Sequence, residues 1–538
     1  MGVGQHDESA MLIDDGSVVA LGDAARAMAV KLSADVIDLA GGFLMPAFGD
    51  GHAHPLFGGL EDAGPQVRGC ASVVEIVAEV KRFAEANPDR EWIVGASYDG
   101  SLAPGGLFDA RWLDEAVSDR PVVLRAWDYH TVWCNSRALE LAGISADSPN
   151  PVLGEIPRRP DGSPLGILRE WGAVELVTSI WCGYSMDDRV AALRRATSHF
   201  ASLGITWVQD AWVEPQDLEA YLEAARRGAL STRINLALLA DPRHFPASLA
   251  WMLEARARVE ELGHPLLTAH SVKFFADGVV ENETGALLEP YCSGMHDHGM
   301  LVWEPQHLAE SVQAVDAAGF QAHIHAIGDA AVRMALDAIE YADQTNGRSD
   351  RRPVIAHVQL TAPQDIARFA QLGVIANMQP YWAQLDALME VLTVPRLGPE
   401  RAERQYQLST LVDAGATLAF GSDWPCSSAD PREGIATAIS RMTADGEPAG
   451  GWTPQEKIDI QTALGAYSGG VATQAFADRS NAPWGQIQLG AAADLVWLQR
   501  DPRAATPATL LGITIQATYL AGNPTYQAAG ADSSAPRD

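Results

Sequence analysis

The chain has 538 residues and a mass of 57.5 kDa, and its 38 basic against 69 acidic residues give a formal net charge of −31. A surface this acidic repels phosphate backbones and anionic lipid, so we expect neither a nucleic-acid partner nor a membrane partner. No apolar run of the sequence approaches the roughly 18 residues that a membrane helix requires. The acidic first residues lack the features of a signal peptide and predict a cytoplasmic protein.

The predicted elements alternate between short apolar runs and segments with helical spacing, which favours the α/β class with a parallel sheet. A glycine-bounded β segment at 12–22 comes first. Eight apolar runs then have the character of barrel strands, at 43–48, 205–210, 234–239, 271–276, 320–325, 353–357, 373–378 and 416–423. Because a closed (β/α)8 barrel, the TIM barrel, needs eight parallel strands, we expect this fold. Helices are expected between the strands, among them 309–319 and 363–373, which both end at glycine.

The gap between the first two barrel runs, about residues 60–200, is far too long for one crossover connection. It also contains strand candidates of its own, at 91–98 and 120–127. We therefore expect an insertion after the first barrel strand.

Segments rich in β-forming residues return near the end of the chain, at 490–499 and 513–526. We expect them to pair with the N-terminal segment in a small β-sandwich domain formed from both chain ends. The expected boundaries are 1–42 and 481–528 for the two parts of this domain, 43–480 for the barrel with its insertion, and 529–538 for a disordered tail.

Polar residues lie within, at the end of or just after several of the predicted barrel strands: Lys273 lies within the fourth, and the others are His52, His54, His325, His357 and Asp423. The C-terminal ends of barrel strands converge on one face, where active sites lie. In the stretch DGHAHP, at 50–55, a single residue separates the two histidines, and an extended segment turns alternate side chains to the same face. Any one of the histidines alone would suit a core position, but the coincidence of all six residues predicts a metal site.

The expected cofactor is a divalent metal, zinc first, with manganese or iron as alternatives, because the ligands are imidazoles and carboxylates. The five cysteines include no CxxC pair, so a thiolate zinc site is not expected. We expect a catalytic site, because a barrel mouth is open to solvent and the set includes an acid that can hold a proton.

Five motifs, in chain order, carry a specific resemblance: DGHAHP, VKFFADG, HIHAIGDAAV, VIAHVQL and LAFGSDWP. They resemble the amidohydrolase superfamily, and within it the family 3 branch that includes N-substituted formamide deformylase. Segments outside the barrel strands are similar to that branch as well, at 130–139, 161–170, 394–406 and 489–502. Small departures occur at Pro46-Ala47 and Gly51. Because relatives usually have another β segment first, the resemblance also implies a start further upstream or an incomplete small β domain.

The resemblance implies that His52, His54 and Asp423 bind a more buried metal ion. It implies that His325 and His357 bind a second ion. The expected content is one or two ions per chain. Lys273 matches the position of a carboxylated lysine that bridges two metals, and a desolvated lysine loses its proton readily enough to take up carbon dioxide. The alternative is that Lys273 stays an ammonium group.

The function that this resemblance implies is hydrolysis of a carbon–nitrogen bond other than a peptide bond, in an amide or an N-acyl or N-formyl amine. Metal-bound hydroxide would attack the carbonyl carbon, and Asp423 would move a proton to the leaving nitrogen, with Lys273 and His325 in the catalytic group. An ester or lactone hydrolase and a mononuclear deaminase remain alternatives on the same fold. A non-enzymatic scaffold is the least expected, because all six ligand positions carry ligating residues.

Substrate contacts are expected from His130 in the insertion and from the aromatic residues Trp133, Tyr381 and Trp382. The alternatives are a structural role for the histidine and ordinary packing for the aromatic rings. Asp277, Gly278 and Asp329 are interpreted as residues that support the ligands or form turns. The expected partner is a small-molecule substrate, and the sequence is compatible with a homodimer.

Overall fold

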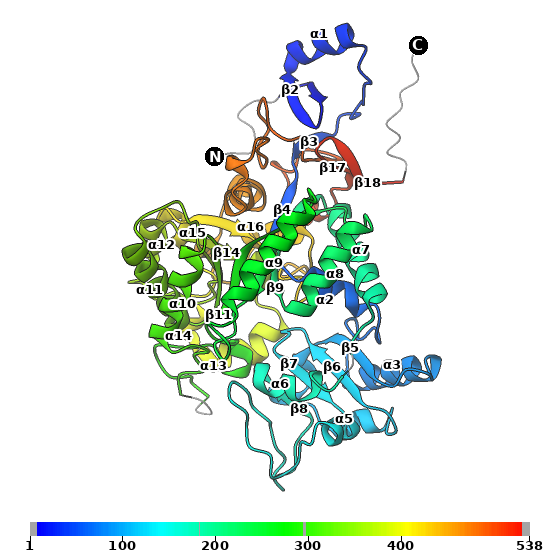
Figure 1. Ribbon diagram of the computed structural model, residues 1–538, viewed down its shortest axis with the longest axis vertical. Coiled ribbons are helices and arrows are strands. Elements are labelled where there is room, and N and C mark those ends of the chain that lie inside the picture. Colours follow the sequence, from blue (N-terminus) through cyan, green and yellow to red (C-terminus); the bar gives the residue numbers. More distant parts are fainter. Residues whose placement is uncertain (1–7, 182, 294–296, 530–538) are drawn as a thin grey trace.

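The centre of the molecule is one parallel sheet of eight strands (Figure 1). The computed structural model describes residues 8–181, 183–293 and 297–529. In spatial order the strands are β4 (Phe48–Ala53), β9 (Ile205–Val213), β10 (Arg233–Leu239), β11 (Leu267–Phe275), β12 (Gln321–Ala326), β13 (Val354–His357), β14 (Ile375–Met378) and β15 (Thr417–Phe420). The sequence-adjacent pairs all run parallel.

The first and last strands meet, so the sheet closes into the expected (β/α)8 barrel. Directly beyond β15, the backbone N–H of Asp423 donates to the carbonyl of His52 at 2.7 Å. The N–H of His54 donates to the carbonyl of Trp424, also at 2.7 Å. These bonds join the chain after β15 to the end of β4, and the fold class predicted from the sequence is confirmed.

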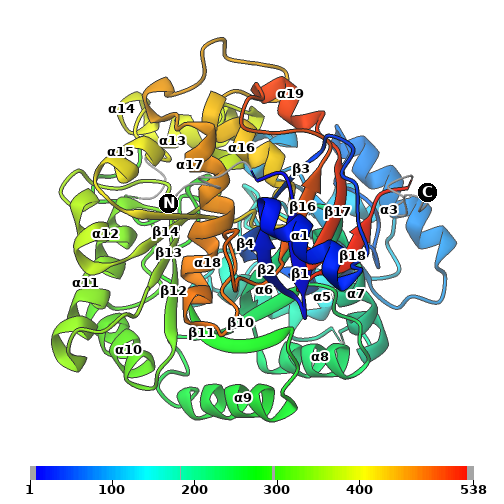
Figure 2. The same cartoon turned by 90° about the horizontal axis from the view of Figure 1, so that it is seen from above.

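Helices surround the strands (Figure 2), as the alternating pattern predicts. The helices of this region are α2 (Pro55–Glu61), α7 (Met186–Ser202), α8 (Pro215–Arg226), α9 (Leu249–Leu262), α10 (Pro305–Ala317), α11 (Asp329–Asn346), α12 (Ile366–Leu372), α13 (Val394–Leu397), α14 (Pro399–Ala402), α15 (Leu408–Asp413), α16 (Pro431–Ser440), α17 (Ile460–Gly465) and α18 (Val471–Gln474). Gly373 ends α12 in the left-handed conformation, with φ of 64°, and its N–H returns to the last turn. The helix expected at 363–373 is thus confirmed in its core.

The first barrel strand lies further along the chain than the sequence pattern predicts. The run 43–48 divides into β3 (Phe43–Pro46), which pairs with β16 (Leu495–Leu498) outside the barrel, and β4. The reason is a change of hydrogen-bond partner: the N–H of Ala47 donates to Asp494 and that of Phe48 donates to Gly204. The strand at 43–48 was therefore wrong as a single barrel strand, and His52 lies within β4 rather than after the strand.

The insertion is a separate four-stranded sheet with its own hydrophobic clusters. Its elements are α3 (Val73–Ala86), β5 (Ile93–Tyr98), α4 (Ala110–Asp114), β6 (Val122–Ala126), β7 (Thr131–Cys134), α5 (Ser136–Leu141), β8 (Ile167–Arg169) and α6 (Glu170–Thr178). Both strand candidates of the sequence, 91–98 and 120–127, are present as β5 and β6. Helix α7 packs in the barrel cluster instead, so the insertion ends before residue 186 rather than near 200.

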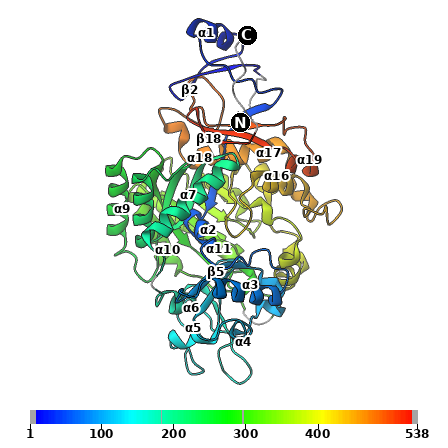
Figure 3. The ribbon, with the colours of Figure 1, turned by 90° about the vertical axis from the view of Figure 1, so that its right-hand side faces the viewer.

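Both ends of the chain meet in a small β domain on the side of the barrel opposite the insertion (Figures 1 and 3). Its main sheet has the order β18-β17-β16-β3, with β17 (Ile515–Leu520) and β18 (Asn523–Gln527). The hairpin of β1 (Met11–Asp14) and β2 (Ser17–Leu21) lies beside it, followed by α1 (Gly22–Leu32), while α19 (Pro507–Leu511) precedes β17. From residue 530 on, the predicted tail lies outside the described residues. Within the described part, no helix is long and apolar enough to cross a membrane.

Candidate metal centre

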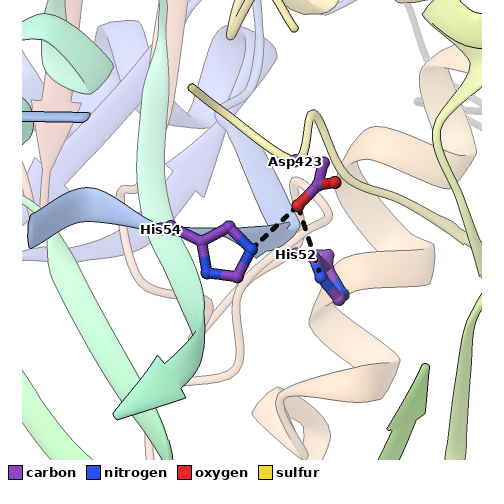
Figure 4. Close-up of side chains that lie close together, drawn as sticks. All are labelled: His52, His54 and Asp423. Atoms are coloured by element: carbon purple, nitrogen blue, oxygen red, sulfur yellow. Dashed lines mark ion pairs between the residues drawn. The ribbon is translucent and has the colours of Figure 1, made fainter. Parts of the chain in front are cut away.

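Three buried side chains from the two ends of the barrel sheet form the centre of the site (Figure 4). His52 and His54 belong to β4 and its C-terminal end, and because they are two residues apart both rings reach the same space. Asp423 follows β15. Its Oδ1 lies 2.9 Å from Nε2 of His54 and 3.5 Å from Nε2 of His52.

Lys273 joins this group from β11. Its Nζ lies 3.4 Å from Nε2 of His52 and 4.3 Å from the centre of the Phe275 ring. The side chain is fully buried, and this burial lowers the pKa of Lys273 to about 7. The amine is therefore much closer to its neutral form at physiological pH than an exposed lysine.

His325 of β12 and His357 at the end of β13 complete the set. Their ring centres are 4.5 Å apart, and the His357 ring is 4.7 Å from that of His52. His325 Nε2 lies 3.0 Å from the carbonyl of Gly278, and His357 Nδ1 lies 2.8 Å from Oε1 of Gln379. Each ring thus has one nitrogen engaged by the protein and one left for another partner. The structure brings all six predicted residues together.

The chemistry of these donors fits a divalent cation. Burial lowers the pKa of all four histidines, that of His357 to about 3, so their imidazoles are neutral and able to ligate. Nδ1 of His54 is buried without a hydrogen-bond partner among the described residues. For Asp423 burial favours the protonated form, but the His54 contact and the neighbouring charges outweigh it and lower the pKa. An anionic carboxylate among neutral imidazoles is a ligand set for zinc or a similar ion.

The backbone around two of these residues is strained. His357 has φ of 75° and Asp423 has φ of 56°, both in the left-handed region that non-glycine residues seldom adopt. Such conformations persist only where the surrounding structure holds them, and they are concentrated at functional sites.

A cavity of about 460 Å³ lies above the six residues. Its wall is rich in aromatic side chains, namely Phe57, Trp127, Tyr129, Trp212, Phe275, Tyr381, Trp382, Tyr406 and Trp424. Three of the four predicted substrate contacts, His130, Tyr381 and Trp382, line it. Trp382 stacks on His357, with the ring planes 2° apart and the centres at 5.4 Å.

Trp133 does not line this cavity, which corrects the expectation from the sequence. Its side chain is fully buried in the core of the insertion, where it packs against Phe108, Tyr98 and Trp112. Its Nε1 donates to the carbonyl of Asp109 at 3.1 Å. The alternating direction of side chains along β7 explains the difference, because Trp133 points into the insertion's own core.

Comparison with known proteins identifies the family. A sequence model of the amidohydrolase family matches residues 35–526 of the chain. The chain belongs to this family. This chain is 31% identical over 503 residues to the protein LONG AFTER FAR-RED 3 of Arabidopsis thaliana. The match covers 91% of this chain and 83% of the relative.

Two further similarities concern a named enzyme and a solved structure. The amidohydrolase is 26% identical over 532 residues to an N-substituted formamide deformylase of Arthrobacter pascens, with 97% and 95% covered. The crystal structure of an uncharacterized metal-dependent hydrolase from Pyrococcus furiosus has a TM-score of 0.69 and 28% identity, with 92% and 95% covered. The expected family and enzyme class are confirmed: the chain is a metal-dependent hydrolase with a small-molecule substrate.

Several residues of the amidohydrolase that support this site were not predicted as such. Nδ1 of His52 lies 2.8 Å from Nε2 of His323, and Nδ1 of His54 lies 4.0 Å from Oδ1 of Asp210. The hydroxyl of Tyr221 donates to Oδ2, the other carboxylate oxygen of Asp210. The signals in the sequence were weak: His323 precedes His325 in the HIH stretch, and Asp210 ends the second barrel run.

Two buried carboxylates of the amidohydrolase fix the loops that surround the site. Asp50 accepts hydrogen bonds from the backbone and the hydroxyl of Ser422, next to Asp423. Asp277 accepts from three backbone N–H groups, those of Ala286, Ile327 and Gly328. Burial raises the pKa of each carboxyl to about 7. The interpretation of Asp277 as a supporting residue agrees with these contacts.

Proposed function

We propose that this amidohydrolase cleaves a carbon–nitrogen bond other than a peptide bond, in an amide or an N-acyl or N-formyl amine. The observation that carries the proposal is the convergence of six side chains of metal-ligating types near the C-terminal ends of the barrel strands, where all six line one cavity. The similarity to an N-substituted formamide deformylase along nearly the whole chain supports this bond type.

The residues proposed to hold the metal form two groups. His52, His54 and Asp423 hold one divalent ion, with zinc as the first candidate. His325 and His357 would hold a second ion, and Lys273, once carboxylated, would supply a further oxygen ligand. When bound, such ions lower the pKa of a water molecule and polarise a carbonyl oxygen.

The proposal for Lys273 rests on its surroundings. The side chain is fully buried, and its nearest polar partner among the described residues is the neutral His52 ring at 3.4 Å. A carboxylate in ion-pair contact with Nζ is not found in the described part of the chain. Burial lowers the pKa of Lys273 to about 7, so the neutral amine that reacts with carbon dioxide is accessible.

Asp423 is the residue proposed to move the proton. As an anion it accepts a proton from the attacking water, and it then delivers this proton to the nitrogen that leaves. Its contact with His54 at 2.9 Å orients the carboxylate toward the space that the substrate would enter. His130, Tyr381 and Trp382 are proposed to contact the substrate, because they line the cavity.

The test joins metal analysis with a substrate panel. The protein is purified without chelator and with bicarbonate present, and its metal content is measured by elemental mass spectrometry. It is then assayed with N-formyl and N-acetyl amines, with an ester of the same acyl group and with an aminopurine. Release of free amine at about two ions per chain supports the proposal, whereas release of ammonia at one ion, or cleavage of the ester alone, contradicts it.

A further inference from the structure

The insertion contributes one hydrogen-bonded pair of side chains to the cavity. His130 lies in the turn between β6 and β7, and Glu170 is the first residue of α6. Nδ1 of His130 and Oε2 of Glu170 are 2.8 Å apart, and both side chains are buried. A buried histidine with a carboxylate on Nδ1 has its other nitrogen directed away from the carboxylate.

Both oxygens of the Glu170 carboxylate have a side-chain partner. The hydroxyl of Thr284, in the loop after β11, donates to Oε1 of Glu170 at 2.5 Å. Gly278 lies directly beneath this carboxylate, since a Cβ at Gly278 would be 2.6 Å from Oε1. The backbone of Glu170 has φ of 60°, a strained value for a non-glycine residue. The carboxylate is therefore oriented by one contact from the insertion, His130, and one from the barrel, Thr284.

His130 is fixed equally well at its backbone. Its N–H donates to Oδ1 of Asp128 at 2.8 Å, and its carbonyl accepts from the N–H of Glu170 at 2.8 Å. Its ring is 5.4 Å from the ring of His325 and 5.9 Å from that of Phe275, and it lines the cavity. With Nδ1 engaged by Glu170, the ring nitrogen open to a ligand is Nε2.

We propose that His130 is a catalytic residue in its imidazolium form: its Nδ1–H donates to Glu170, and its Nε2–H donates a hydrogen bond to the carbonyl oxygen of the substrate. Glu170 is the positioning residue that holds it there. This inference rests on the proposed amide hydrolysis. As the water oxygen bonds to the carbonyl carbon, the π electron pair moves to the carbonyl oxygen and the water proton moves to Asp423. His130 stabilises the negative oxygen without giving up its proton. The electron pair on the oxygen then re-forms the C=O bond. The C–N bond breaks with its electron pair passing to the nitrogen, which takes the proton from Asp423.

The charges around the two residues agree with this division of roles. Burial alone would lower the pKa of His130, but Glu170 and Asp128 outweigh it and raise the pKa.

The test compares kinetic constants of variants at His130 and Glu170. Loss of one oxyanion donor lowers kcat by about 100-fold or more, so we expect this loss for His130→Asn with KM changed little. Glu170→Gln, which keeps the shape but not the charge, is expected to have a smaller loss of kcat. The double variant should be no worse than His130→Asn, because the two residues act as one unit.

Two control variants make the same substitutions, Glu to Gln and His to Asn, at residues outside the cavity. Glu175→Gln is on α6 as well and removes an ion pair, that with Arg243, away from the cavity. His244→Asn changes a histidine on the surface. Both controls should retain the wild-type kcat. Metal content and circular dichroism of every variant confirm folding, and His130→Gln replaces His130→Asn where the latter fails to fold.

The leaving group separates the proposed role from proton donation. Two amides with the same acyl group, one of an aniline and one of an alkylamine, should lose kcat equally in His130→Asn. A much larger loss for the alkylamine would assign proton transfer to His130 and overturn the proposal, as would an unchanged kcat.

Failure of the proposed function has a different signature. If the wild type cleaves only the ester, amide hydrolysis is refuted, but ester hydrolysis passes through the same oxyanion. The His130 and Glu170 variants are then compared on the ester, where a loss of kcat supports the role of the pair and wild-type rates refute it.

Discussion

Nδ1 of His52 is hydrogen bonded to Nε2 of His323 at 2.8 Å, inside the barrel and away from the cavity. This contact fixes the ring so that Nε2 of His52 faces Asp423 and Lys273. The orientation of a candidate ligand is thus set by a second histidine that comes from β12, four strands away around the barrel.

His323 should therefore determine metal affinity without touching the metal. Mutation of residues that orient ligands lowers metal affinity by about 10- to 100-fold, and we expect this range for His323→Asn. Competition with a chromogenic chelator measures the affinity directly. His270→Asn, on β11 and exposed, is the matched control and should bind metal like the wild type. Unchanged affinity in the His323 variant would show that the contact is not required.

Asp423→Asn should abolish proton transfer to the leaving nitrogen. General acid–base residues contribute about 100- to 10,000-fold to the rate, so we expect a loss of kcat in this range. The variant is compared with the wild type at equal metal content, which elemental analysis establishes. A variant with normal metal content and wild-type kcat would exclude Asp423 as the proton carrier.

Lys273 should take up carbon dioxide as the pH rises. The pKa of Lys273 is lowered from 10.5 to about 7 by burial, so the neutral amine predominates above pH 7 and the ammonium below it. Metal-free protein given 13C-bicarbonate and zinc should show a carbamate carbon signal at pH 8.5 and much less at pH 6. Lys273→Arg, whose side chain stays charged, should show none. A wild type without this signal at pH 8.5 would identify Lys273 as an unmodified amine.

Truncation of Trp382 should change substrate binding, whereas truncation of Trp133 should change stability. Trp382→Ala removes a ring from the cavity wall and is expected to raise KM, with little effect on unfolding. Trp133→Ala opens a hole in the insertion core and should lower the free energy of unfolding by about 3–5 kcal/mol. Denaturant unfolding and steady-state kinetics together separate the two effects. If the Trp133→Ala variant is fully folded and its KM is raised, Trp133 contacts the substrate after all.

Barrel strands were predictable where apolar runs are continuous, because strands buried on both faces must be apolar along their length. β4 was not, since its sequence FGDGHA is poor in β-forming residues. It is held by hydrogen bonds to β9 and by Asp50, neither of which the local sequence reveals.

The candidate ligands were predictable for a related reason. A residue at the C-terminal end of any barrel strand lies on the same face of the barrel, where active sites are found. The contacts of His323, Asp210 and Glu170 depend on strand register and on how the insertion sits on the barrel. Trp133 was misplaced because its direction depends on the insertion's own core.

The seam where the first and last strands meet passes through the site itself. His52 and Asp423 lie on opposite sides of that seam and share both a backbone hydrogen bond and a side-chain contact. An ion held by both residues would link the first and last strands, so binding of the ion and closure of the barrel would be thermodynamically coupled. The melting temperature should then depend on the free concentration of that ion, as it does for any ligand that binds only the folded chain.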